Sequence, residues 1–269
     1  NILDIKGGLN DVVMNNSPID IDKLIEGTNE ILTANRNSLQ LFDMLHSMRQ
    51  FDDLTYVHSV NVALIASILG QWLKFSEKDI RILTISGLLH DIGKIMIPNE
   101  ILTKPGKLTV AEYNIMKQHV NFGYEKVKNQ NIDIRIKEAC LLHHEKCDGT
   151  GYPFGLKSDH IPAVAKIIAI ADVYDAMTSA RVYRGALCPF EVIDTMYKDA
   201  FTKFEPEYIL PFLKNVASSY INNDVRLSDG RIGKVVLINE NALSLPIVQC
   251  EDEFIDLSKT RGLTVSAIL

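Results

Sequence analysis

Apolar positions recur at helical spacing along most of this chain. Between Ile21 and Met48 they follow one another at steps of three, four or their sums, which predicts one long or broken helix. The same spacing predicts further helices at 53–73, 77–91, 109–128, 132–145, 162–180, 189–199 and 206–220. The main body of the protein is therefore expected to be α-helical.

The pattern changes after residue 222. Asn222, Asn223 and Asp229-Gly230 are turn formers, and the apolar runs that follow them are short. Strands are predicted at 225–227, 232–238, 246–250 and 254–257. We therefore expect a mainly α fold in three parts: an N-terminal loop and linker helix at 1–50, a helical domain at 51–221 and a small β-rich extension at 222–269.

Residues 54–73 carry no formal charge and have the length of a membrane span. They include His58, Asn61 and other polar side chains that would lack partners in hydrocarbon, so a helix of a soluble protein is expected instead of a span. No basic-then-apolar signal segment follows Asn1. The sequence is expected to be a piece of a longer, cytoplasmic protein.

Composition narrows the class of function. An apolar fraction of 46% with 23% charged residues is typical of a globular protein. The net charge of −6 argues against a broad cationic surface for duplex nucleic acid. The four cysteines form no CxxC pair, so neither a disulfide scaffold nor a cysteine zinc site is indicated.

Two short clusters carry side chains that bind metals. His90-Asp91 stands where a helix is expected to end, and Lys94 follows one turn later. His143-His144 is the second cluster. Adjacent residues of a helix diverge by roughly 100°, so these two imidazoles would serve two neighbouring ions rather than one. The pair therefore favours a dinuclear site.

Four further residues are ambiguous when each is taken alone. His58 lies in an apolar helix and His119 borders a buried stripe, and both positions are more typical of core histidines than of ligands. Asp172 interrupts an apolar run, and an inward-facing carboxylate needs a partner or a metal. Asp175 shares the face of Asp172. The stripe beside His119 consists of Val110, Tyr113, Met116, Val120, Gly123 and Val127.

Taken together, these side chains suit two transition-metal ions with Asp91 placed to bridge them. Two metals roughly 3.5–4 Å apart activate a bridging hydroxide and clamp a phosphoryl group, which points to phosphodiester hydrolysis. The expected ligand set is His58, His90, Asp91, His119, His143, His144 and Asp172.

Three segments of the chain resemble the HD-GYP family, the cyclic di-guanylate (cyclic di-GMP) phosphodiesterase branch of the HD superfamily. They are His90-Asp-Ile-Gly-Lys94, His143-His-Glu-Lys-Cys-Asp-Gly-Thr-Gly-Tyr-Pro153 and Asp172-Val-Tyr-Asp-Ala-Met-Thr-Ser-Ala-Arg-Val-Tyr-Arg184. The resemblance runs from about residue 50 to 215 and implies that 51–221 is an HD-type catalytic domain.

The resemblance also implies roles for individual residues. The family's metal ligands match the seven residues of the expected set, and Lys94 matches a contact to phosphate or nucleophile. Tyr152, Arg181 and Arg184 match dinucleotide-binding positions, and Asp175 matches a carboxylate suspected in proton transfer. The implied cofactors are two divalent ions, with Fe or Mn expected ahead of Zn, Co, Ni or Mg.

Two positions depart from the family pattern. Leu54 stands where some members carry a glutamate that helps to hold a third metal, so two metals are expected here. Cys147 takes a place usually held by a bulky, often aromatic residue.

The sequence thus predicts a phosphodiesterase that hydrolyses cyclic di-GMP to linear pGpG, with further hydrolysis to GMP left open. Two alternatives stand beside it. One is a hydrolase of another cyclic dinucleotide, such as cyclic GMP-AMP, and the other is a catalytically silent module that binds a dinucleotide or a protein. A homodimer through the N-terminal helix and an upstream sensor or receiver domain are further expectations, without duplex nucleic acid or a membrane span.

Overall fold

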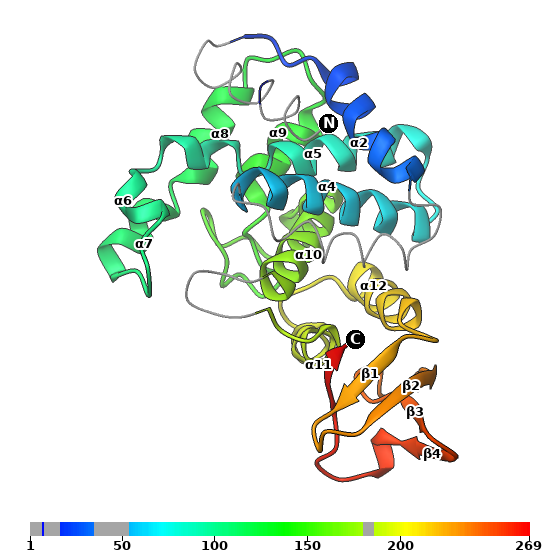
Figure 1. Ribbon diagram of the computed structural model, residues 1–269. Helices are drawn as coiled ribbons and strands as arrows, with labels where there is room; N and C mark the ends of the chain where they lie inside the picture. The colour runs from blue at the N-terminus through cyan, green and yellow to red at the C-terminus, as the bar shows by residue number, and fades with distance from the viewer. Residues whose placement is uncertain (1–6, 8–16, 35–53, 180–185) are drawn as a thin grey trace.

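The computed structural model describes residues 7, 17–34, 54–179 and 186–269. Helices form the larger body, and a small antiparallel sheet follows at the C-terminal end (Figure 1). The longer helices are α2 (Ile21–Ala34), α4 (Leu54–Trp72), α5 (Glu77–Leu89), α7 (Val110–Met116), α8 (His119–Val127), α9 (Ile134–Leu142), α10 (Ala163–Thr178), α11 (Pro189–Asp199) and α12 (Pro206–Ser219). The short ones are η1 (Ile92–Met96), α6 (Asn99–Leu102), η2 (Ser158–His160) and η3 (Leu257–Lys259). The mainly α fold with a small β part is therefore confirmed.

Helix α4 is the centre of the helical body. Every residue from 59 to 70 is buried in the protein, which explains the absence of charged side chains from this segment. Close packing against α5 depends on Gly87, where an added Cβ would lie 2.5 Å from the Cα of Ala63. In the part of the chain that the structure describes, no helix has the length and apolar character needed to cross a membrane.

The single helix predicted at 109–128 is two helices. The capping box of Thr109 and Glu112 opens α7 as expected, but α7 ends at Met116 and α8 starts at His119. Val110 is 81% exposed and Tyr113 48% exposed, so the predicted buried stripe holds only for the α8 half. Apolar spacing missed the break because a turn of two residues nearly preserves helical phase.

The C-terminal sheet has five antiparallel strands in the order β4-β3-β2-β1-β5. Their bounds are β1 (Asp224–Leu227), β2 (Ile232–Leu237), β3 (Ile247–Cys250), β4 (Glu253–Asp256) and β5 (Val265–Ile268). The first four strands agree with those predicted, whereas β5 was not predicted, because its short run carries Ser266 and Ala267 between Val265 and Ile268.

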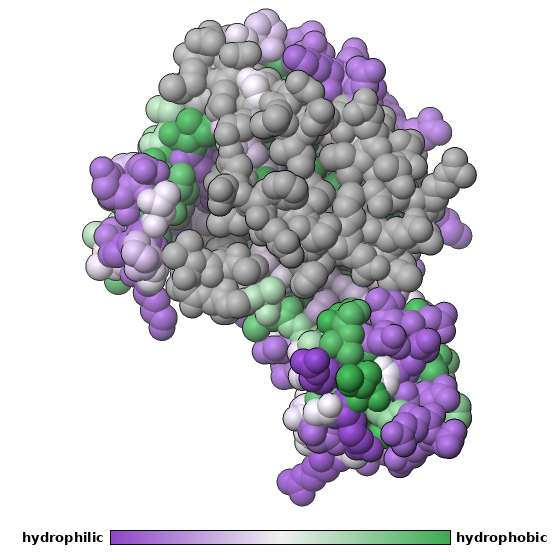
Figure 2. All heavy atoms as spheres, in the orientation of Figure 1, coloured by the Kyte–Doolittle hydropathy of each residue, from purple (hydrophilic) through white to green (hydrophobic). Residues whose placement is uncertain are grey.

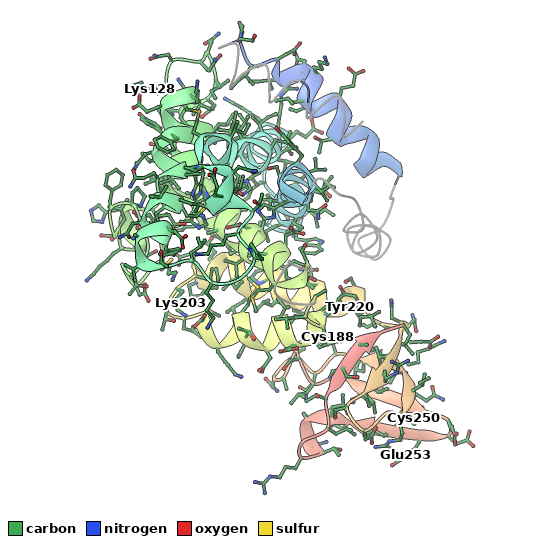
Figure 3. All side chains as sticks on the ribbon, turned by 60° about the vertical axis from the view of Figure 1, so that its left-hand side comes forward. Lys128, Cys188, Lys203, Tyr220, Cys250 and Glu253 are labelled. Carbon is green, nitrogen blue, oxygen red and sulfur yellow. The ribbon has the colours of Figure 1, made fainter. Side chains whose placement is uncertain are left out.

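The sheet adjoins the helical body through β5, which contacts α11. Buried residues of the helices and of the sheet belong to one continuous apolar cluster. Tyr220 lies where α12 leads into the sheet, whereas Glu253 lies at the sheet's far end (Figure 3). The visible surface of the sheet is largely hydrophilic, with a hydrophobic group toward the helical body (Figure 2).

Candidate metal centre

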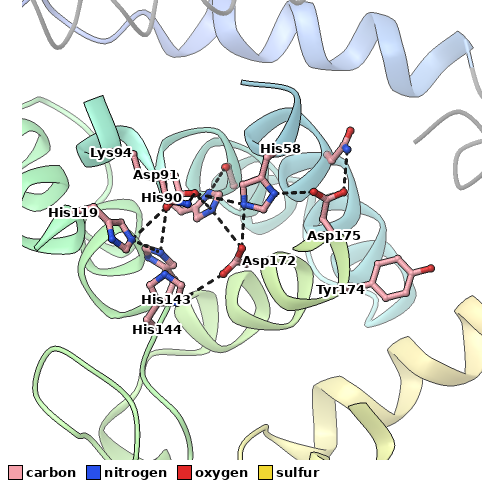
Figure 4. Close-up of polar contacts among 12 residues, drawn as sticks. His58, His90, Asp91, Lys94, His119, His143, His144, Asp172, Tyr174 and Asp175 are labelled. Carbon is pink, nitrogen blue, oxygen red and sulfur yellow. Dashed lines mark hydrogen bonds and ion pairs between the residues drawn. The ribbon is translucent and has the colours of Figure 1, made fainter. Parts of the chain in front are cut away.

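The seven predicted metal ligands come together in the structure, although they arise from five separate segments (Figure 4). His58 lies on α4 and Asp172 on α10, while the others stand at helix ends. Gly93 permits the close approach of η1 to α8, because an added Cβ would lie 2.0 Å from the carbonyl oxygen of His119. This contact brings the Asp91 segment beside the first turn of α8.

Asp91 occupies the middle of the cluster. Its Oδ1 lies 3.3 Å from His119 Nε2 and 3.8 Å from His143 Nε2. Its Oδ2 lies 3.2 Å from His90 Nε2 and 3.5 Å from His58 Nε2. The two oxygens of one carboxylate thus face two different pairs of imidazoles.

These contacts define two groups of donor atoms, each compact enough for one ion. The first consists of Asp91, His119, His143 and His144, and the second of His58, His90 and Asp91. Atoms bound to one first-row ion at about 2.1 Å lie roughly 3.0–3.4 Å apart, which is close to the spacings around Asp91. Asp91 belongs to both groups, as the sequence predicted for a bridging ligand.

Backbone carbonyls fix the orientation of three imidazoles. His90 donates its Nδ1–H to the Gly87 carbonyl at 2.7 Å, and His119 donates to the Met116 carbonyl at 2.8 Å. His143 donates in the same way to the Ala139 carbonyl at 3.0 Å. In each neutral ring the other nitrogen, Nε2, then carries a lone pair. All three Nε2 atoms point into the cluster, which is the arrangement that metal-binding histidines adopt.

The converging lone pairs fit a cation. His119 Nε2 lies 3.5 Å from His143 Nε2, and burial lowers the pKa of both rings, so both are neutral acceptors near pH 7. Within the described residues, His90 Nε2 and Asp91 Oδ1 are buried without a hydrogen-bond partner. Buried acceptors that face one another are costly unless a positive charge lies between them. The donor set therefore fits a metal centre.

Asp172 lies at the side of the cluster and reaches both groups. Its Oδ1 is 3.0 Å from His58 Nε2, and its Oδ2 is 3.8 Å from His144 Nδ1. Burial alone would raise the pKa of Asp172, but the hydrogen bond with His58 and the neighbouring imidazoles hold it well below its usual value. Asp172 is therefore ionised at neutral pH.

Asp175 lies on the other side of His58. Its Oδ2 accepts a hydrogen bond from His58 Nδ1 at 2.7 Å, and its Oδ1 accepts one from Asn61 Nδ2 at 3.0 Å. Burial lowers the pKa of His58, but the bonds to Asp172 and Asp175 outweigh burial and raise it to about 9. The predicted shared face of the two aspartates is seen in their contacts to one ring.

Helical divergence predicted that His143 and His144 would serve two different ions, and this prediction was wrong. Helix α9 ends at Leu142 with His143 as its C-cap residue, and both histidines belong to the same donor group. The two donor groups meet instead at Asp91, whose two oxygens face different imidazoles.

Lys94 lies one turn after Asp91 on η1, and its ammonium contacts Asp91 Oδ2. Burial alone would raise the pKa of Asp91, but the neighbouring His90 and the charge of Lys94 hold it well below its usual value. The side chain of Lys94 is 23% exposed, so it is partly accessible to solvent.

Tyr152 stands at the rim of the first donor group. Its ring stacks on His144 with centroids 4.7 Å apart and planes inclined by 30°. Burial raises the pKa of Tyr152, so its hydroxyl stays protonated and can donate a hydrogen bond.

Glu145 holds the loop that carries Tyr152, and sequence reasoning gave it no role. Its carboxylate accepts backbone N–H groups of Phe154 at 2.7 Å, Gly155 at 3.1 Å and Leu156 at 2.9 Å. Its position directly after two ligand histidines was the available signal. Asn61, which donates to Asp175, was likewise missed, because a lone amide in an apolar helix gives no pattern.

Three predicted features cannot be placed. Arg181 and Arg184 lie outside the described residues, as does the C-terminal part of the predicted helix ending at Met48. Leu54 begins α4, but its side chain is outside the described set.

Comparison with known proteins gives consistent results. The family model described as "HD domain" matches residues 25–208. "Cyclic di-GMP phosphodiesterase PA4108" of Pseudomonas aeruginosa is 36% identical over 203 residues, covering 75% of this chain and 49% of that protein. "3'3'-cGAMP-specific phosphodiesterase 1" of Vibrio cholerae is 36% identical over 173 residues, covering 63% of this chain and 38% of that protein. The chain thus spans half or less of the length of these relatives.

A solved structure supports the fold assignment. The protein described as Bd1817, a HDG"Y"P protein from Bdellovibrio bacteriovorus, superposes with a TM-score of 0.57 at 18% identity. The superposition covers 77% of this chain and 69% of that one.

Proposed function

Because this chain belongs to the HD domain family, in its HD-GYP branch, we propose that it is a metal-dependent phosphodiesterase that hydrolyses cyclic di-GMP to linear pGpG. The observation that carries this proposal is the position of Asp91, whose two oxygens face two sets of buried imidazoles. A shared carboxylate between two donor groups is the expected arrangement for a two-metal phosphodiesterase.

The proposed metal ligands are the seven residues of the cluster, which would hold two divalent ions, Fe or Mn ahead of Zn, Co, Ni or Mg. When bound, such ions supply Lewis-acid activation of water and neutralise charge on the phosphoryl group. The seven proposed ligands are His58, His90, Asp91, His119, His143, His144 and Asp172.

The remaining residues bind and orient. Lys94 binds a phosphate oxygen of the ligand, because its partly exposed side chain places an ammonium group beside Asp91. Tyr152 donates a hydrogen bond from its hydroxyl to the ligand, and its ring stacks on His144. Arg181 and Arg184 bind phosphate or guanine edges, as the family resemblance implies.

We assign Asp175 a positioning role. Both of its oxygens are engaged, by His58 and by Asn61, and the His58 ring lies between Asp175 and Asp91. Its negative charge keeps the Nδ1 proton in place and leaves His58 Nε2 directed at the cluster.

The two alternative functions differ in how well the comparisons and the sequence support them. A relative named for cyclic GMP-AMP is as similar in identity as the one named for cyclic di-GMP, so the nucleotide preference rests on experiment. A silent binding module is disfavoured because all seven ligand positions are occupied by donor side chains. A cytoplasmic location, a homodimer and an upstream sensor or receiver domain are further proposals.

Measuring the products formed from two cyclic dinucleotides distinguishes the proposed function from its two alternatives. Protein purified without oxygen is incubated with cyclic di-GMP or 3′3′-cyclic GMP-AMP in the presence of Mn²⁺ or Fe²⁺, and products are resolved by chromatography. Faster formation of pGpG than of the mixed linear product supports the proposal. The opposite order supports the cyclic GMP-AMP reading, and binding without product supports the silent module.

A further inference from the structure

Lys117 and Tyr113 lie beside Tyr152 at the rim of the metal centre, and the family resemblance gives neither of them a role. Lys117 Nζ is 5.3 Å from the ring centroid of Tyr113 and 6.0 Å from that of Tyr152. Both distances are within cation–π range. Because Tyr152 also stacks on His144, the rim continues from the donor cluster to α7.

The break between α7 and α8 produces this arrangement. Tyr113 and Lys117 are four residues apart at the end of α7, so they lie on one face, and His119 enters the cluster two residues later. Tyr113 is 48% exposed, so much of its side chain is accessible to solvent. The exposed ring is available to a ligand.

The charge of Lys117 is also available. The neighbouring Lys94 and Lys104 are paired with Asp91 and Glu112. Lys117, in contrast, forms no ion pair with any residue that the structure describes and instead contacts two aromatic rings. An ammonium in this position can donate to acceptors on a ligand without first giving up a carboxylate.

We propose, as an extension of the proposed function, that Tyr113, Lys117 and Tyr152 form a subsite for one guanine base of the cyclic dinucleotide. Aromatic side chains stack on bases of any kind. The ammonium adds selectivity, because guanine presents two acceptors, O6 and N7, on one edge, whereas adenine presents an amino donor in place of O6. The subsite therefore prefers guanine to adenine.

Equilibrium binding tests this subsite without turnover. Calorimetry measures the Kd of cyclic di-GMP and of cyclic di-AMP for metal-depleted protein, using the wild type, Lys117→Met, Lys117→Arg and Tyr113→Ala. Lys78→Met is the matched control, since Lys78 is exposed in the first turn of α5, roughly 17 Å of helix from its end beside His90. Metal content after reloading shows whether each variant keeps the centre intact.

The expected result is a Kd for cyclic di-GMP about tenfold higher in Lys117→Met, with a smaller change for cyclic di-AMP. Lys117→Arg should retain the guanine preference, Tyr113→Ala should weaken both ligands, and Lys78→Met should match the wild type. Equal Kd values for wild type and Lys117→Met, or equal losses for both ligands, would overturn the subsite.

The same data separate this inference from the proposed function. Wild-type protein that binds cyclic di-GMP through Lys117 but yields no product with metal added contradicts the hydrolase and leaves the subsite standing. Turnover of cyclic di-GMP with no effect of Lys117→Met contradicts the subsite alone. If the wild type binds neither dinucleotide without metal and yields no product with metal added, both proposals fail.

Discussion

Asp175 Oδ2 accepts a 2.7 Å hydrogen bond from Nδ1 of His58, on the side of the ring that faces away from Asp91. Both groups come from long helices that lie against each other, α4 and α10. The bond therefore connects the orientation of a proposed ligand to the packing of the helical core.

Replacing Asp175 with asparagine should weaken metal binding by about tenfold to a hundredfold, because a neutral amide no longer fixes the ring or its Nδ1 proton. Added metal should restore much of the lost activity. A metal titration of the variant measures the effect. Asp159→Asn is a matched control, since Asp159 pairs with His160 at 2.9 Å but both side chains are exposed. Equal metal affinity in the two variants would contradict the positioning role.

Glu145→Gln should lower the free energy of unfolding by about 1–3 kcal/mol. The carboxylate now accepts hydrogen bonds from three backbone N–H groups. In the variant, the amide N–H donor would face such a backbone donor, and a hydrogen bond would be lost. The KM for cyclic di-GMP should also rise, because the loop carries Tyr152. Urea unfolding and steady-state kinetics measure both effects, with the exposed Glu100→Gln as control. Unchanged unfolding would show that the loop does not depend on this carboxylate.

The pH dependence of stability should include a contribution from Glu112. Hydrogen bonds from Lys104 and Thr109 lower its pKa from 4.5 to about 2. A carboxyl group whose pKa is lower in the folded state than in the unfolded state stabilises the folded protein at pH values above the unfolded pKa. For Glu112 this contribution is lost as the pH falls from 4.5 toward 2. Glu112→Gln should therefore be less stable than the wild type at pH 7, with a difference that shrinks below pH 4.5. Urea unfolding at pH 7, 5 and 4 checks this, and a constant difference would contradict it.

Removal of residues 222–269 should leave metal content unchanged, because every proposed ligand precedes residue 173. Stability and solubility should fall, since β5 contacts α11 and the sheet shares the apolar cluster of the helices. Thermal unfolding and metal analysis of the truncated protein measure the two properties. A soluble truncation that retains no metal would show that the sheet supports the site.

Local patterns predicted much of the fold. The capping box at Thr109 gave a correct helix start, and the charge-free segment after Leu54 gave a correct helix, because capping and burial act over a few residues. The break before His119 and the end of α9 before His143 were missed, because both depend on packing between distant segments. The close contact of Gly93 with α8 is one such constraint.

The candidate site shows the same division. Residue types predicted a metal cluster, and the structure brings those side chains together around Asp91. The carbonyl partners that orient the imidazoles, such as Gly87 for His90, have no side-chain signature. Glu145 acts on backbone groups, and Lys117 acquires its neighbours from a turn that spacing concealed. Such roles arise from geometry that residue identity alone does not encode.

Anomalous scattering at the edge of the bound metal tests the dinuclear centre most directly. Crystals of the metal-loaded protein should show two strong peaks, one between Asp91 and His119 and the other between Asp91 and His90, with Asp91 contacting both. Leucine at position 54 offers no donor atom for a third ion, so two full peaks are expected. A single peak, two peaks that do not share Asp91, or a third peak of full occupancy in the absence of substrate would contradict this account.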